Sequence, residues 1–141
     1  HTEGKKRKLA PLTVVVLDAG GHIQSTFKSS CSKLMRPQVA MAKAWGAIGL
    51  GVSSRKSGEM GEERPMFMTA LINIADQKLL PVPGRVLVQD NNNQAIGSVG
   101  ITGDLSDEDE HCAVTGIQAA GLVADTNKNS EPILVQFIPL N

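Results

Sequence analysis

The most suggestive chemical feature of the chain is a histidine placed directly after a glycine-rich turn. The segment Leu17-Asp18-Ala19-Gly20-Gly21-His22 separates a β-branched run, residues 13–16, from a mixed run, residues 23–27. Two adjacent glycines favour a tight hairpin turn, because glycine adopts positive φ without steric cost. Imidazole is a metal ligand and a proton carrier near neutral pH. His22 is therefore a candidate metal ligand or acid–base group, and the alternative is a histidine that only satisfies backbone groups of its turn.

A second candidate follows another turn glycine. Gly84 and Arg85 stand between a proline-punctuated stretch, residues 79–83, and a strand-like run, residues 86–89. A guanidinium can hold a carboxylate through two parallel hydrogen bonds. Arg85 is thus a candidate clamp for a carboxylate-bearing ligand, and a solvated surface arginine is the alternative.

Four other residues have structural interpretations. Asp18 is expected to accept N–H bonds of its own turn. Lys43 lies inside an alanine-rich segment and is expected to extend to solvent, and the alternative is a positive group that points towards the ligand groove. Cys112 is expected to be buried as a small hydrophobic residue, and Cys31 to be exposed in a polar loop. The two cysteines form no C-x-x-C pair, so the sequence gives no zinc or redox motif.

These groups must be positioned by strands that pair as hairpins and by helices packed on them. The sequence predicts a long loop with at most one turn of helix over residues 53–64. It also predicts a turn at residues 90–93, where Asp and Asn tolerate left-handed conformations. The predicted strands are residues 13–17, 22–27, 86–89 and 95–102, and the predicted helices are residues 37–50, 66–75 and 106–121. Hairpins, rather than alternating strands and helices, indicate an α+β fold with an antiparallel sheet.

Composition excludes several classes of function. The 141 residues suit one domain, and the 14 basic and 14 acidic residues cancel. A neutral chain with three Phe, one Trp and no Tyr offers neither the charge nor the stacking platforms that nucleic-acid binding needs. The sequence shows no apolar run near the roughly 20 residues of a membrane span and no signal peptide. We therefore expect a cytoplasmic protein without a nucleic-acid or membrane partner.

Taken in order, five segments resemble one known family, the haem-binding GlcG-like and HbpS-like proteins, which include the C-terminal domain of PduO-type proteins. The resemblance extends from about Leu9 to Leu122. The segments are Val14-Val15-Val16-Leu17-Asp18-Ala19-Gly20-Gly21-His22, Ala40-Met41-Ala42-Lys43-Ala44, Arg64-Pro65-Met66-Phe67, Leu80-Pro81-Val82-Pro83-Gly84, and Ile96-Gly97-Ser98-Val99-Gly100-Ile101-Thr102-Gly103 followed by Asp109-Glu110.

The resemblance implies a profilin-like α/β sandwich, a sheet flanked by helices that assembles into homo-oligomers. It also implies a small-molecule ligand, haem or another tetrapyrrole, with His22 as the axial ligand of the haem iron. Gly84 and Arg85 would then line the ligand groove, with Arg85 on a propionate. The chain departs from the family here, because Arg85 and Leu87 replace a glycine and a proline, and this puts the identity of the ligand in doubt.

The same residues leave two other functions open. The chain could be a small enzyme without a large cofactor, with His22 as the acid–base group and Arg85 holding a carboxylate-bearing metabolite. It could also be an assembly subunit. Residues 1–122 are predicted to form one domain whose first helix is truncated, and residues 123–141 a C-terminal extension. The apolar stretch 133–138 would serve as an edge strand or interface arm.

Overall fold

A computed structural model describes residues 11–52, 54–82, 84–103 and 106–125. These residues form a five-stranded sheet in the order β2-β1-β4-β3-β5, and every neighbouring pair is antiparallel. The strands are β1 (Thr13–Asp18), β2 (Ile23–Lys28), β3 (Arg85–Gln89), β4 (Ala95–Thr102) and β5 (Val123–Asp125).

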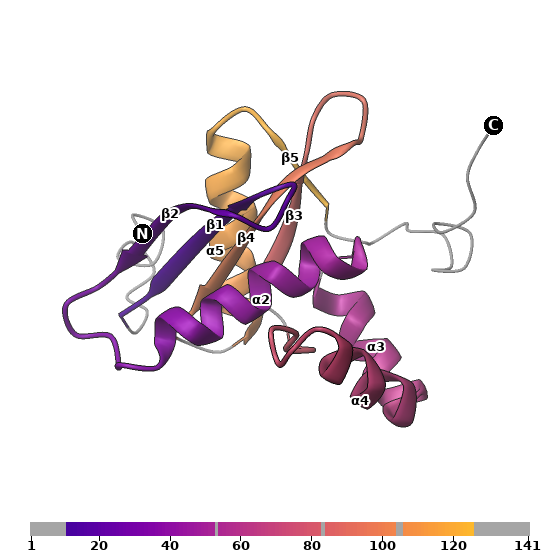
Figure 1. The fold of residues 1–141 in the computed structure, drawn as a ribbon. Helices are drawn as coiled ribbons and strands as arrows, with labels where there is room; N and C mark the ends of the chain where they lie inside the picture. Colours follow the sequence, from indigo (N-terminus) through magenta and orange to yellow (C-terminus); the bar gives the residue numbers. More distant parts are fainter. Residues whose placement is uncertain (1–10, 53, 83, 104–105, 126–141) are drawn as a thin grey trace.

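Helices cover both faces of this sheet (Figure 1). The helix α2 packs on one face of the sheet and α5 packs on the other. The helices α3 and α4 follow α2 in the chain. The helices are α2 (Arg36–Leu50), α3 (Ser54–Glu63), α4 (Pro65–Ile74) and α5 (Ser106–Ala119). The predicted α+β fold, an antiparallel sheet flanked by helices, is confirmed. No helix in the described ranges is long and apolar enough to cross a membrane.

Alternating side chains of β1 divide the core into two layers. Val15 and Leu17 pack with Ala40 and Ala44 of α2. The residues between them face the other way, where Val14 packs against the cluster that α5 forms with β3 and β4. Because successive strand residues point to opposite faces, the apolar run 13–17 can fill both layers at once.

Small residues on β4 allow α2 to lie very close to the sheet. A Cβ atom at Gly100 would overlap the carbonyl oxygen of Ala40 and lie 2.8 Å from the backbone nitrogen of Ala44. Next to it, the hydroxyl of Ser98 donates to the carbonyl oxygen of Ala44 at 2.7 Å. The glycine inside this strand therefore marks a close approach between helix and sheet backbones.

We expect Gly100→Ala to destabilise the fold by about 1–3 kcal/mol, the usual cost of overpacking a closely packed core. Urea unfolding followed by circular dichroism measures the change. The matched control is Gly116→Ala in α5, where an added Cβ meets no atom within 4 Å. That variant should be neutral or slightly stabilising, since alanine favours a helix over glycine. Equal stability of the two variants would contradict the close-approach interpretation.

Two segments differ from the sequence prediction. Residues 54–63 form the helix α3, so the predicted long loop over residues 53–64 is wrong. Its two glycines and its serines made the helix hard to see, yet Ser57 is fully buried and tertiary packing overrides the weak local propensity. The strand β5 lies beyond the predicted domain boundary at residue 122 and pairs with β3. The predicted arm at residues 133–138 and the predicted truncated first helix lie outside the described residues.

Candidate functional site

The β1–β2 hairpin places His22 at one end of the sheet. The backbone nitrogen of Asp18 donates to the carbonyl oxygen of His22 at 2.9 Å, and that of Gly21 donates to the carbonyl oxygen of Asp18 at 3.0 Å. Gly21 has φ 81°, a conformation that glycine adopts without strain. The predicted tight turn is thus confirmed.

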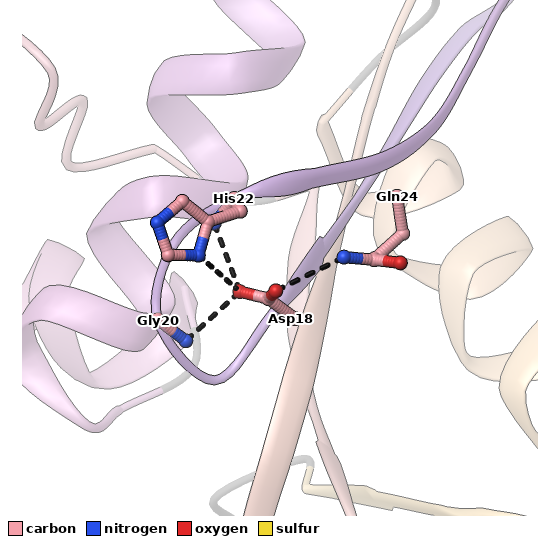
Figure 2. A network of polar contacts seen from close by, with 4 residues as sticks. All are labelled: Asp18, Gly20, His22 and Gln24. Atoms are coloured by element: carbon pink, nitrogen blue, oxygen red, sulfur yellow. Dashed lines mark hydrogen bonds and ion pairs between the residues drawn. The ribbon is translucent and has the colours of Figure 1, made fainter.

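Asp18 organises this turn with both carboxylate oxygens (Figure 2). Its Oδ1 accepts the backbone N–H groups of Gly20 and His22, each at 2.9 Å, and its Oδ2 accepts the side-chain amide of Gln24 at 2.9 Å. The pKa of Asp18 is lower than its ordinary value, mainly because its carboxylate accepts the backbone N–H of His22. Partial desolvation raises the pKa, and the hydrogen bond from the Gly20 N–H lowers it further. The expected role of Asp18 as an acceptor of turn N–H groups is confirmed.

The same carboxylate contacts the imidazole ring. His22 Nδ1 lies 3.3 Å from Asp18 Oδ1, while 79 % of the His22 side chain is exposed. A carboxylate at Nδ1 favours the tautomer with the proton on that nitrogen, and the lone pair of Nε2 is then available. The pair can therefore offer a metal ligand or a proton acceptor to a molecule that approaches from solvent.

Figure 2 shows the imidazole and the Gln24 amide on opposite sides of Asp18. The Gln24 side faces an apolar groove of about 550 Å³ between the sheet and α5, a volume in the usual range for small-molecule sites. The groove is lined by apolar side chains that include Val14, Val16, Ile96 and Ile117. Asp18 also lines it, and its carboxylate is charged at neutral pH. The charged carboxylate disfavours an anionic group at that end of the groove.

The imidazole side of the hairpin has a different surface. Ile23 follows His22 and is 58 % exposed. The half-buried indole of Trp45, on α2, lies beneath the turn, where a Cβ at Gly21 would be 3.3 Å from Nε1. The Lys78 ammonium lies 5.4 Å from the centroid of the Trp45 ring. An indole therefore lies beneath the turn, and a cation lies beside that indole.

Arg85 does not share a site with His22. It is fully buried, and its guanidinium donates through Nη1 to the carbonyl oxygen of Leu80 at 2.9 Å and through Nη2 to the hydroxyl of Ser57. Burial lowers the pKa of Arg85 to about 10, which still leaves it charged at neutral pH. The structure shows neither the surface arginine nor the open ligand clamp that the sequence suggested. His22 and Arg85 therefore do not lie in one pocket, as the small-enzyme alternative requires.

Strand register separates the two residues further. Arg85 pairs with Gly100 and Asp18 pairs with Gly97, three positions along β4. At about 3.3 Å per residue this is roughly 10 Å along the strand. Gly84, at φ 106°, faces the Lys43 ammonium rather than the hairpin, since a Cβ there would lie 2.6 Å from Nζ.

Lys43 belongs to a buried ion pair that the sequence did not reveal. Its Nζ lies 3.2 Å from Asp109 Oδ2 and donates to the carbonyl oxygen of Ile101 at 2.9 Å. Desolvation lowers the pKa of Lys43, while the charge of Asp109 acts in the opposite direction. The prediction that Lys43 extends to solvent is wrong, because the short α2-to-sheet distance leaves its side chain inside the protein.

The remaining candidate groups are dispersed. Cys31 is exposed and Cys112 is buried, as predicted. Within the described ranges, His, Cys, Asp and Glu side chains nowhere gather in groups of three or more that could hold a metal ion. A metal bound in this part of the chain would need most of its ligands from elsewhere, as a haem iron does from its porphyrin.

Solved structures share this fold. A complex of PduOC with haem gives a TM-score of 0.78 at 21 % identity, covering 89 % of this chain and 88 % of that one. The Klebsiella pneumoniae protein ORFY gives 0.74 at 20 % identity, with coverages of 85 % and 81 %. HbpS gives 0.72 at 19 % identity, with coverages of 84 % and 79 %.

The sequence comparisons identify a family. No curated protein sequence matches the chain. The model of one family, described as haem degrading protein HbpS-like, matches residues 2–118. This match spans most of the chain and includes the hairpin, the buried ion pair and both helical layers. The chain belongs to the HbpS-like family.

Proposed function

We propose that this protein binds haem or another tetrapyrrole, with His22 as the axial ligand of the iron. The observation that carries the proposal is the contact between His22 Nδ1 and Asp18 Oδ1 at 3.3 Å. Histidines that bind metals usually donate their second ring nitrogen to a carboxylate or carbonyl, which fixes the ring and raises its basicity. Membership of the HbpS-like family and the likeness to a haem complex support the same ligand.

The tetrapyrrole would lie on the imidazole side of the hairpin. There the exposed Ile23 and the indole of Trp45 offer apolar surface for the macrocycle. Lys78, beside that indole, can pair with a propionate, a role for which the buried Arg85 is not available. The groove on the other side of Asp18 is less suitable, because its carboxylate repels propionates.

Titration of the protein with haemin tests this proposal. We expect a saturable shift of the Soret band, and a spectrum typical of histidine-ligated iron. The same titration with an unrelated neutral protein of similar size reports non-specific association. A Soret band that grows linearly with haemin, without saturation, would contradict haem binding by this chain.

Asp18→Asn tests the role of the carboxylate separately. The amide oxygen can still accept the Gly20 and His22 N–H groups, so the turn should persist while the negative charge near Nδ1 is lost. We expect haemin affinity to fall about 10–100-fold, the usual cost of losing such a partner. Gln24→Ala, which removes the other side-chain contact of Asp18, serves as the control and should change the affinity far less.

The same substitution has an effect on acid stability. The pKa of Asp18 is lower in the folded protein, so its stabilising contribution is present above the unfolded pKa and is lost as the pH falls through the folded one. Asp18→Asn should therefore flatten the pH dependence of unfolding in the acid range. In the haemin titration, an affinity of Asp18→Asn equal to that of the wild type would show that the carboxylate does not orient the His22 imidazole.

A further inference from the structure

The apolar groove between the sheet and α5 has a charged group at one end. Val14, Val16 and Asp18 share one face of β1, because successive strand residues point to opposite faces. All three line the groove. The distance from Val14 to Asp18 along the strand is roughly 13 Å, at about 3.3 Å per residue. The groove is therefore elongated, and its carboxylate lies at the end beside the hairpin turn.

The neighbouring strand leaves this carboxylate uncovered. Val99 and Ile101 of β4 lie opposite the two valines of β1 and extend the apolar floor of the groove. Asp18 pairs instead with Gly97, which has no side chain that could cover the carboxylate. Among the described residues that line the groove there is no lysine, arginine or histidine. The charge inside the groove is therefore negative.

One oxygen of Asp18 can accept a further hydrogen bond. Its Oδ1 accepts the backbone N–H groups of Gly20 and His22. Among the described residues, the side-chain amide of Gln24 is the donor to Oδ2, and a carboxylate oxygen has two lone pairs. Figure 2 shows this second oxygen turned away from the imidazole. A donor that enters the groove can therefore bond to Oδ2 while the turn keeps its own hydrogen bonds.

Small residues of α5 leave space along the other wall of the groove. Ala113, Gly116 and Ala120 line it, and their spacings of three and four place them on one side of the helix. A Cβ atom at Gly116 would meet no atom within 4 Å. Gly116 and Ala120 are exposed, so the groove opens to solvent. Its volume of about 550 Å³ is thus accessible to a small molecule.

We propose that this groove binds a small organic cation, an apolar molecule with a protonated amine at one end. The apolar body would lie between the sheet and α5, and the ammonium would donate to Oδ2 of Asp18. A hydrogen bond between an ammonium and a carboxylate is stronger than one between neutral groups, and the same carboxylate repels an anionic ligand. This site lies on the opposite side of Asp18 from the imidazole, where the proposed tetrapyrrole would bind.

Three probes of equal chain length test the proposal: octylammonium, octanol and octanoate. Each is titrated at low millimolar concentration into the isotope-labelled full chain, and amide chemical shifts report affinity and location. We expect octylammonium to bind at least about 10-fold more tightly than octanol, octanoate to bind most weakly, and the amides of Val99 and Ile117 to shift. The titrations contain no haemin, so their result is independent of tetrapyrrole binding. Equal affinities, no saturable binding, or shifts confined to residues outside the groove overturn the proposal.

A matched pair of charge removals tests the role of the carboxylate. Asp18→Asn should lower the affinity for octylammonium to that for octanol. Asp90→Asn is the control, because Asp90 Oδ1 accepts the backbone N–H groups of Asn92 and Gln94 in the turn after β3 but does not line the groove. This variant should bind octylammonium like the wild type. A preference for octylammonium that Asp18→Asn retains, or that both variants lose equally, overturns the proposal.

Filling the groove tests the site without changing Asp18. In Gly116→Met the new side chain would occupy the open space beside α5, and methionine favours a helix over glycine, so the fold should persist. We expect octylammonium to bind at least about 10-fold more weakly, the effect of excluding a few methylene groups from an apolar site. Circular dichroism checks the fold. Wild-type affinity of folded Gly116→Met for octylammonium also overturns the proposal.

Discussion

Replacing His22 with alanine should weaken haemin binding by at least about 100-fold and remove the spectral signature of histidine ligation. The expected effect exceeds the roughly 10–100-fold that loss of the carboxylate beside the histidine costs, because the iron loses the ligand itself. The fold should be unaffected, since 79 % of the His22 side chain is exposed and its ring makes one polar contact, with Asp18. Haemin titration and circular dichroism measure the two properties.

Two further measurements separate ligation from general affinity. His111→Ala removes another exposed histidine, on α5, and should leave the titration unchanged. Free imidazole added to His22→Ala should restore a histidine-like spectrum, because it fills the coordination position that the side chain left. A spectrum of His22→Ala identical to that of the wild type would show that another group ligates the iron, even if haem binding itself is confirmed.

The hairpin could be predicted because its causes are local. The β-branched run before Asp18 favours a strand, the two glycines favour a turn, and the carboxylate finds its N–H partners within four residues. The strands β1 to β4 and the helices α2, α4 and α5 followed from similar short-range signals, whereas α3 and β5 did not. Such features depend on neighbours in the sequence, where a single chain carries the most information.

Arg85 and Lys43 could not be placed in the same way, because their surroundings come from distant segments. The partner of Lys43 is 66 residues away. Space for the Arg85 guanidinium depends on Gly46, where a Cβ would overlap Nη1. Charged side chains are rarely fully buried unless paired, so exposure was the reasonable expectation for each. The glycines beside them were visible in the sequence, but nothing local indicated which side chain they accommodate.

Family resemblance and local pattern therefore contributed different parts of the site. The resemblance suggested that His22 and Arg85 face one ligand, whereas the register of β3 and β4 places them at different levels of the sheet. The departure of this chain at Arg85 has a structural consequence. Its guanidinium ties β3 to the carbonyl of Leu80 and to Ser57 of α3, and so fixes the helical layer below α2. Lys78 then remains as a cation beside the Trp45 indole.

The second large effect is expected at the buried pair of Lys43 and Asp109. Their side chains are 4 % and 1 % exposed, so Asp109→Asn would leave the Lys43 ammonium buried without its counter-charge. Breaking such a pair costs about 3–5 kcal/mol, a large part of the roughly 5–15 kcal/mol that stabilises a domain. Urea unfolding at pH 7 measures the loss. Glu62→Gln, at an exposed position, is the control and should change the unfolding free energy by less than about 0.5 kcal/mol.

The pH dependence of this variant gives a sharper result than its stability alone. Desolvation lowers the pKa of Lys43 in the folded protein, and Asp109→Asn removes the attraction that partly offsets it. The unfolded chain then binds more protons than the folded one between the folded and unfolded pKa values, so stability should rise with pH across that window. Asp109→Asn should recover part of its lost stability as the pH approaches about 10.

A double variant, Lys43→Met with Asp109→Leu, should be much more stable than either single charge removal, because no buried charge remains unpaired. Additive losses in the double variant would show that the two side chains stabilise the fold separately and not as a pair.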